Sequence, residues 1–587
     1  LGILWMGGDV HLTAFYMTKQ PLVANGRFFI QGTETRSAAA SVVNAYDVYT
    51  GIPLWKKKLD LEIASEEYFF DGKSRYHAKS GEKEQEYPYS FTKTARGKLV
   101  GTSEAADLPR PYRNVDKVLN VMDVNTGKLI WQHQAQNGVL GFVLGKDKLF
   151  YYDAFPSRYL EKMSRRGVAV EQKSSLVALD FANGKVLWKR EVDPLAAVFD
   201  EKLGSLVRHT GANFSPSDDD GLCYSEQHDV LIASDSVYRI FAFQGATGKK
   251  LWDRVVMPDP VTSLEYDRYN KYNYMAPFIL NDTSIYTQHR EVFDLLTGAK
   301  KQVGHPITGE TQAYELGLGG KSCDKNMGSK NLIYSRHWTS AYENINERVG
   351  STYLCSVRSS CKQATFIVAG GVMNMPDTGG GCSCTSFPMA SSVAMIEMPE
   401  NEYWSISNFK ASQGPMQKCG INFGAPGDRL DEGILWYRYP QIPLRVPAIK
   451  SFDPQLPVKA VVSRPHYFYR NALRLKEGDK KWVAASGVEG LKELSIEVDK
   501  PGLPEKTFRL KLYFSETEDL EPGKRVFNIF VQNEKVIEEL DITKKANGAN
   551  RVLVETISNV KATDMIRLRL EPIQGRTLLC GVSVVKI

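Results

Sequence analysis

The sequence lacks several features that point directly to a class of function. Histidine is scarce, with nine residues among 587. No run of about 18 apolar residues is present, so no transmembrane helix is predicted. Long runs of lysine or arginine are also missing and the net charge is only +6, which argues against nucleic acid as the main partner. We find no H-E-x-x-H or G-x-S-x-G motif and no phosphate-binding glycine loop.

The overall composition is that of a globular protein. Hydrophobic residues make up 42% and charged residues 24% of the chain, which excludes a disordered polypeptide. Glycine and proline are near average usage and show no collagen period. The aromatic fraction of 11% favours a turn-rich β protein over a helical one. The length corresponds to roughly four domains of ~150 residues each.

The cysteines are concentrated in one region. Five of the eight lie between residues 323 and 384, and an even total clustered in this way predicts disulfides and an oxidising compartment. The disulfide candidates are Cys323, Cys355, Cys361, Cys382 and Cys384. A metal or redox role is the alternative, although their spacings fit zinc poorly. The chain begins at Leu1 without Met, so we expect that a leader was removed or left out.

One unit recurs along the first 300 residues. An apolar alternating stretch is followed by Asp, Asn or Thr and then Gly, and a second stretch ends in Trp. This pattern predicts two strands joined by a tight turn in which Gly has a positive φ. The copies are AYDVYTGIPLW (45–55), VMDVNTGKLIW (121–131), ALDFANGKVLW (178–188), AFQGATGKKLW (242–252) and a partial VFDLLTGAK (292–300).

The conserved chemistry within each copy predicts how the units pack. The turn glycines are Gly51, Gly127, Gly184 and Gly248, and the tryptophans are Trp55, Trp131, Trp188 and Trp252. A large flat side chain at one fixed place suggests that neighbouring units dock through it. A further strand pair precedes each copy, and four strands per repeated unit describe a β-propeller blade. The signature D-x-x-T-G-K-x-x-W resembles the tryptophan-docking repeat of PQQ-type β-propellers.

The number of blades is expected to be seven or eight. Segments 331–345 and 366–398 are interpreted as two more blades. The segment GILWMGG (2–8) resembles a final strand that closes the ring with part of 400–440. We interpret 62–118 and 154–174 as insertions between blades, with Lys79–Glu86 as a solvated loop. These assignments place the propeller at residues 1–440.

A second domain is predicted after a proline-rich linker at 441–460. Residues 461–587 contain at least seven short strands with turns at regular intervals, which predicts a β-sandwich. The segments 508–542 and 578–587 resemble malectin and related carbohydrate-binding jelly rolls. The resemblance implies that Tyr513 and Phe514 help to bind a glucose disaccharide. Trp482 is the aromatic residue in the stretch that corresponds to the family's other ligand tyrosines, whereas 574–577 lacks the family's binding acid.

No cofactor is predicted. The resemblance to quinoprotein dehydrogenases implies PQQ with calcium as the alternative. Those enzymes carry two adjacent cysteines beside the cofactor, and the nearest feature here is Cys382-Ser383-Cys384. The acidic run Asp218-Asp219-Asp220 offers hard oxygens for Ca²⁺, but a solvated turn is the preferred interpretation.

The sequence therefore predicts an all-β protein with a seven- or eight-bladed propeller followed by a jelly-roll sandwich. We expect a bacterial binding or scaffold protein in the periplasm, outside the cell or on its surface. Its predicted partner is a protein or a cell-surface glycan, because loops on a rigid scaffold carry recognition. We favour a non-enzyme. The alternative is a divergent PQQ-dependent dehydrogenase or another carbohydrate-active enzyme with its site on the propeller axis.

Overall fold

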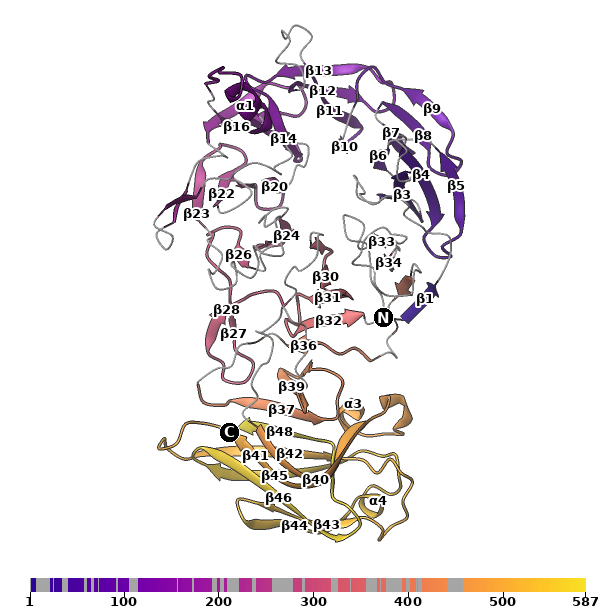
Figure 1. Ribbon diagram of the computed structural model, residues 1–587, viewed down its shortest axis with the longest axis vertical. Helices are drawn as coiled ribbons and strands as arrows, with labels where there is room; N and C mark the ends of the chain where they lie inside the picture. Colours follow the sequence, from indigo (N-terminus) through magenta and orange to yellow (C-terminus); the bar gives the residue numbers. More distant parts are fainter. Residues whose placement is uncertain are drawn as a thin grey trace.

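The structure, a computed structural model, is nearly all-β (Figure 1). A ring of sheets fills the upper part of the view, and a sandwich lies below it. No described helix is long and apolar enough to cross a membrane. The structure describes residues 2–6, 22–24, 26–33, 41–57, 61–64, 68–71, 73–90, 93–104, 115–155, 157–171, 174–192, 198–200, 205–207, 221–234, 239–255, 278–287, 291–317, 326–337, 339–354, 367–369, 371–375, 393–396, 398, 402–407, 409, 414–441 and 458–587.

Within these residues, eight antiparallel sheets of three to five strands form the ring. The first four sheets contain β2 (Leu22–Ala24), β3 (Arg27–Thr33), β4 (Ser41–Asp47) and β5 (Pro53–Lys57); β6 (Leu61–Ala64), β7 (Tyr68–Asp71), β8 (Ser74–His77) and β9 (Lys83–Glu86); β10 (Lys93–Ala95), β11 (Lys98–Glu104), β12 (Asp116–Asp123) and β13 (Leu129–Gln134); and β14 (Val139–Leu144), β15 (Lys148–Asp153), β16 (Ser175–Asp180) and β17 (Val186–Glu191).

The ring continues with four further sheets and closes on the N-terminal strand. They contain β20 (Leu222–Ser225), β21 (Val230–Ser234), β22 (Arg239–Gln244) and β23 (Lys250–Val255); β24 (Ile279–Asn281), β25 (Ser284–Tyr286) and β26 (Val292–Asp294); β29 (Met327–Gly328), β30 (Leu332–His337), β31 (Thr339–Asn344), β32 (Gly350–Leu354) and β36 (Ile406–Ser407); and β33 (Ile367–Ala369), β34 (Val372–Met375), β35 (Val393–Ile396) and β1 (Gly2–Met6). Outside them lie β18 (Val198–Asp200), β19 (Ser205–Val207), β27 (Gln302–Gly304), β28 (Thr311–Ala313) and helix α1 (Ser157–Ser164).

The predicted turn chemistry is confirmed. In the third sheet, the Asp123 carboxylate accepts hydrogen bonds from the backbone N–H groups of Asn125 and Thr126, at 3.0 and 2.7 Å. The backbone N–H of Gly127 donates to the Asp123 carbonyl, and Gly127 has a φ of 69°. The hydrogen bonds from Thr126 lower the pKa of the Asp123 carboxyl. The side chain and the glycine together fix the turn, as the repeat predicts.

The tryptophans dock on the next sheet, also as predicted. Trp188 is buried, and a Cβ atom added to Gly248 would lie 2.6 Å from its ring. The Trp188 indole N–H donates to the Gly245 carbonyl oxygen at 2.8 Å. Two equivalent pairs are Trp131 with Gly184 and Trp252 with Gly298. The indole therefore fits only because the facing turn residue has no side chain.

The interpretation of 62–118 as an insertion is wrong, because this stretch contains a complete sheet, β6–β9, and the start of the next. Lys79–Glu86 forms the turn and outer strand of that sheet rather than a solvated loop. Trp55 packs on its turn at Gly81, and Tyr87 takes the place of tryptophan against Gly127. The Tyr87 hydroxyl donates to the Val124 carbonyl at 2.5 Å. The sheet was missed because its copy of the repeat has neither Asp nor Trp.

The ring closes through the N-terminal strand, but with a different partner from the one predicted. β1 pairs with β35, in register Gly2 with Ile396, instead of with part of 400–440. The predicted blades at 331–345 and 366–398 are present as the sheets of β30–β31 and β33–β35. The other predicted insertion, 154–174, carries α1.

The C-terminal domain is a sandwich of two six-stranded sheets, as expected for a malectin-like domain. The first contains β38 (Arg429–Asp431), β39 (Ile434–Tyr439), β37 (Lys418–Phe423), β48 (Gly581–Lys586), β42 (Lys506–Phe514) and β45 (Leu553–Ala562). The second contains β40 (Val458–Tyr469), β41 (Ser486–Glu497), β46 (Met565–Gln574), β43 (Val526–Val531) and β44 (Glu534–Asp541), with β47 (Leu578–Leu579) paired to β41. Short helices are η2 (Ala472–Arg474), α3 (Lys481–Ala484) and α4 (Ile542–Lys545).

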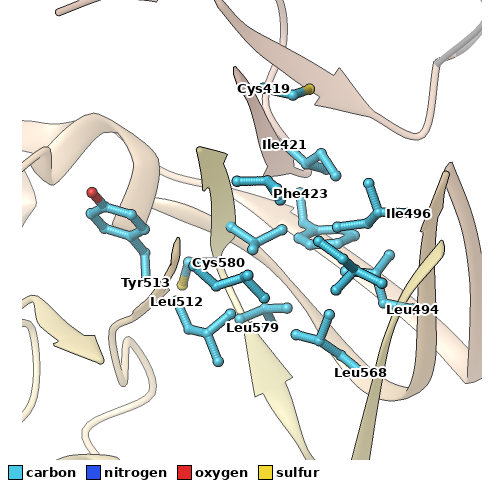
Figure 2. Close-up of a cluster of buried hydrophobic side chains, with 14 of the residues drawn as sticks. Cys419, Ile421, Phe423, Leu494, Ile496, Leu512, Tyr513, Leu568, Leu579 and Cys580 are labelled. Atoms are coloured by element: carbon cyan, nitrogen blue, oxygen red, sulfur yellow. The ribbon is translucent and has the colours of Figure 1, made fainter. Parts of the chain in front are cut away.

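The first sheet corrects the predicted domain limits of 1–440 and 461–587. β37 pairs along β48, at the other end of the sandwich sequence, and β39 pairs in parallel with β37. Cys419, Ile421 and Phe423 alternate toward the core between the two sheets and belong to the same buried cluster as Leu494 and Leu579, part of which Figure 2 shows. The sandwich therefore includes 418–439. β39 and β40, the strands before and after the proline-rich segment in the sequence, both belong to the sandwich, so that segment marks no domain boundary.

Candidate functional site

The aromatic pair predicted to bind sugar is buried. Tyr513 is 1% exposed and Phe514 is fully buried. Tyr513 packs edge-on against Trp436, with ring centroids 5.3 Å apart, and Phe514 packs against Phe527 at 6.2 Å. Both rings fill the sandwich core, so neither offers a face on which a sugar ring could stack. The prediction for these two residues is corrected accordingly.

The stretch 574–577, where the malectin resemblance lacks an acid, is held by a network of ion pairs. Arg576 contacts the carboxylate of Glu489 at 3.3 Å and donates to the Arg464 carbonyl at 2.6 Å. Arg525 lies between Glu489 and Glu516, at 2.7 and 2.6 Å, and all three are buried. Each charge has an opposite partner, which is what burial requires. This end of the sandwich is a structural cluster.

The third predicted residue, Trp482, lies at the edge of an open site. It is 9% exposed and packs edge-on against Trp436 and Trp404, with ring centroids 5.6 and 5.9 Å away. Its indole lines a cleft of about 920 Å³ between the propeller and the sandwich. This volume lies within the range of ligand sites in proteins. We refer to this space as the interdomain cleft.

Three parts of the chain line the interdomain cleft. The propeller contributes Asn331, Tyr334, Tyr342, Asn344, Glu347, Met373, Met395 and Met398. The bridging segment, residues 402–407, contributes Glu402, Tyr403 and Ser405. The sandwich contributes Arg429, Asp431, Glu432, Asn471, Leu473, Asp479, Lys480, Lys481 and Trp482. Aromatic, apolar and charged groups thus converge from two domains.

The bridging segment ties the two domains together. Its strand β36 pairs with β32 of the propeller, and its Ser405 forms a backbone bridge with Asp428 of the sandwich. The buried Asp428 carboxylate accepts hydrogen bonds from the Ser407 N–H at 2.8 Å and from the Arg438 side chain at 3.1 Å. One short segment is therefore hydrogen-bonded to both walls of the cleft.

A second connection comes from the β27–β28 hairpin. Ile307, at the hairpin tip, is part of the buried cluster that forms the sandwich core. Its carbonyl oxygen accepts the backbone N–H of Gln417 at 2.7 Å. Val349 of the propeller joins the same cluster. With two connections, the walls are fixed relative to each other and the cleft is preformed.

Arg429 has an unusual setting within the cleft. Its guanidinium carbon lies 4.7 Å from the ring centroid of Tyr403 and 4.8 Å from that of Trp482. Both distances are within cation–π range. Burial and the nearby Glu347 raise the pKa of Tyr403, whose hydroxyl donates to the Glu347 carboxylate at 3.3 Å. The arginine is thereby held by two aromatic side chains, one of which is itself hydrogen-bonded.

The acidic residues beside Arg429 have another cation as partner. The Lys480 ammonium donates to the carboxylates of Asp431 and Glu432, the latter at 2.9 Å. Burial acts against the charge of Lys480, but these hydrogen bonds outweigh it and raise the pKa of the ammonium group.

Burial and the nearby Asp479 charge raise the pKa of the Tyr513 hydroxyl, under this corner of the cleft, to about 12.

Sequence reasoning found Trp482 and missed the rest of the cleft. Arg429 and Tyr403 lie in the segment that was assigned to the closure of the propeller, and Lys480 lies in the sandwich stretch around Trp482 but was given no role. Two signals were present: the tryptophan and tyrosine residues of 403–404 and 436–439, and the charged run that ends at Lys481. Neither signal says which sheets the segments join, so their convergence could not be predicted.

The predicted disulfide candidates lie outside the described residues, as do Cys382-Ser383-Cys384 and Asp218–Asp220. Disulfides, PQQ and calcium therefore stay predictions. Of the cysteines that the structure describes, Cys223, Cys419 and Cys580 are free thiols. Burial raises the pKa of Cys419 and of Cys580 to about 12, so both are inert at neutral pH.

Family models match two separate parts of the chain. Residues 113–309 match a model described as the outer membrane protein assembly factor BamB, and residues 491–579 match the malectin domain. The chain thus combines a PQQ-type β-propeller with a malectin-like β-sandwich. No curated protein matches the sequence.

Several solved structures are similar to parts of the chain. BamB from Moraxella catarrhalis is 13% identical, with 56% of this chain and 82% of that chain covered and a TM-score of 0.30. A quinohemoprotein alcohol dehydrogenase from Pseudomonas putida HK5 is 12% identical over 70% and 79%, with a TM-score of 0.37. A Bacteroides uniformis beta-glucuronidase is 13% identical over 29% of this chain, with a TM-score of 0.22. The match spans 18% of the length of that enzyme.

Proposed function

We propose that the protein is an extracytoplasmic, non-catalytic scaffold that binds a carbohydrate in the interdomain cleft. Both of its domain types are typical of extracytoplasmic proteins, and domains like these suggest binding of a carbohydrate or a protein. The malectin-like sandwich favours a carbohydrate. Its ligand is then held between the domains, because the predicted aromatic pair at 513–514 is buried.

The observation that carries the proposal is the preformed cleft itself. Its walls offer aromatic and apolar surface together with amide, carboxylate and cationic groups, and this mixture suits the apolar faces and hydroxyl groups of sugars. Leu473 and Met398, from opposite walls, are 67% and 38% exposed. A rigid site binds with less loss of conformational entropy than a flexible one.

A glycan array with Tyr403→Ala tests the proposal. Tyr403 lines the cleft and holds Arg429, so the variant should lose about tenfold or more in affinity for any glycan that binds the intact protein. Tyr49→Ala is the matched control, because Tyr49 is an exposed tyrosine in the turn between β4 and β5 of the propeller. If no glycan binds, or if both variants bind like the unmodified protein, the cleft is not a carbohydrate site.

A further inference from the structure

The setting of Arg429 specifies which ligand the cleft prefers. The guanidinium carbon lies within 5 Å of the ring centroids of both Tyr403 and Trp482, at 4.7 and 4.8 Å. A guanidinium group carries five N–H donors in one plane, arranged so that two of them can bind one carboxylate. Arg429 also lines the open space of the cleft. Two cation–π contacts restrict the positions that this guanidinium group can take before any ligand binds.

Most of the carboxylates that line or adjoin the cleft have partners other than Arg429; Glu402, for example, accepts the Tyr469 hydroxyl at 2.5 Å. Asp431 and Glu432 are paired with Lys480, and Asp428 is paired with Arg438. Glu347 accepts the Tyr403 hydroxyl. Among the residues that the structure describes, no carboxylate forms an ion pair with Arg429. The cleft therefore presents a partly buried cation whose fork-shaped donor set lacks an acidic partner of its own.

A carboxylate is the group that fits such a fork. Arginine and a carboxylate form two parallel N–H···O hydrogen bonds, and these charge-assisted pairs are both stronger and more directional than neutral ones. We propose that Arg429 binds the carboxylate of an acidic sugar, so that the ligand of the cleft is a uronic-acid-containing oligosaccharide. This inference rests on the proposed carbohydrate-binding function and narrows it to one class of glycan.

The remainder of the cleft suits an oligosaccharide better than a small free anion. The space of about 920 Å³ is far larger than a single carboxylate requires. Met398 and Leu473 provide apolar surface at its two walls, and the exposed Asn471 adds an amide beside Leu473. Arg429 thus anchors the acid while the other walls contact the sugar rings.

Titration calorimetry with two tetrasaccharides tests the inference. Tetragalacturonate carries carboxylates, and maltotetraose is a neutral α-1,4-linked tetrasaccharide of the same length. The unmodified full chain should bind tetragalacturonate about tenfold or more tightly than maltotetraose, in line with a charged hydrogen-bond pair. This comparison needs no variant. The preference should weaken with added salt, because the interaction is between charges.

Variants of Arg429 assign the preference to one side chain. Arg429→Gln should reduce affinity for tetragalacturonate to that for maltotetraose, and Arg429→Lys should retain only part of the preference, because lysine lacks the planar fork. Arg509→Gln removes an exposed arginine of the sandwich that does not line the cleft, and it should bind like the unmodified protein.

Each contrary result has a distinct meaning. If maltotetraose binds as tightly as tetragalacturonate, or if Arg429→Gln weakens both equally, the cleft binds carbohydrate but the acid preference is wrong. If a poly-glutamate peptide displaces tetragalacturonate at equal concentration, the preferred ligand is an acidic peptide and the assignment to a glycan is wrong. If neither tetrasaccharide binds and the glycan array is empty, the proposed function itself is overturned.

Discussion

At the scale of single residues, glycines facing aromatic rings hold the propeller together. Gly248 has a φ of 65° and lies against the ring of Trp188. Two requirements meet at this position: the backbone conformation favours glycine, and the docked ring leaves no space for a Cβ atom. The repeat contains glycine there for both reasons, whereas at Gly167 only the first applies. The two effects can therefore be separated by experiment.

Gly248→Ala should be more destabilising than Gly167→Ala. Gly167 has a φ of 71°, but nothing lies within 4 Å of its added Cβ atom. Gly167→Ala should cost about 1 kcal/mol from backbone strain alone. Gly248→Ala should cost about 1–3 kcal/mol more, because the Cβ atom would lie 2.6 Å from the indole. Urea unfolding measures the free energy of unfolding of both variants. Equal losses would show that the Trp188 ring leaves room for a Cβ atom at residue 248.

The buried Glu489 predicts a dependence of sandwich stability on pH. Burial opposes its charge, but Arg525 outweighs this and holds the pKa of Glu489 below its ordinary value. The resulting stabilisation is complete above the ordinary carboxyl pKa of about 4.3, and it is lost as the pH falls through the lower folded-state value.

Glu489→Gln tests this dependence. At pH 7 the variant should lose on the order of 3 kcal/mol, because Arg525 loses one of its buried partners. The difference from the unmodified protein should shrink as the pH falls below about 4. Glu493→Gln, at an exposed position of the same strand, should be nearly neutral. A pH-independent difference in unfolding free energy would contradict the role assigned to the charge.

At the scale of elements, β37–β39 belong to the sandwich although their sequence precedes the proline-rich segment. β37 lies between β39 and β48 in the first sheet, so its removal would leave β48 without a partner on one side. Trp436 on β39 is buried against Tyr513 of β42. The sandwich core is therefore incomplete without these strands, and an unpaired strand edge favours aggregation.

Two fragments should differ sharply in folding. Residues 414–587 contain every strand of the sandwich, and we expect a soluble domain with one cooperative unfolding transition. Residues 461–587 lack β37–β39 and should be insoluble or loosely packed, because Ile421, Phe423 and Trp436 leave the core. Circular dichroism during thermal unfolding distinguishes the two. A cooperative 461–587 fragment would contradict the boundary given by the structure.

The same elements show how far sequence reasoning reaches. The turn motif predicted the propeller, because each copy carries its own local chemistry at Asp, Gly and Trp. It failed at β6–β9, where His77 and Gln85 stand at the Asp and Trp positions although Gly81 remains, and where Tyr87 packs against Gly127 instead of a tryptophan. Sequence reasoning also assigned β37 to the wrong domain, because an apolar strand pattern does not indicate which strand it pairs with. Tyr513 and Phe514 were correctly assigned to a strand, but strand assignment does not give exposure.

At the scale of the whole molecule, the cleft exists because two folds share one core. Ile307 of the propeller contributes to the sandwich cluster, and the bridging segment is hydrogen-bonded to both domains. The site is thus a property of the assembled chain. Neither the propeller repeat nor the sandwich sequence contains it alone, which explains why the family resemblances did not reveal it.

Hydrogen–deuterium exchange with and without the glycan that binds most tightly on the array tests the central claim most directly. The account predicts slower exchange in the bridging segment 402–407, in 429–432 and in 471–482, which together surround the interdomain cleft. Exchange along the outer propeller strands should not change. Protection confined to the propeller, or to the sandwich away from these segments, would contradict binding in the interdomain cleft.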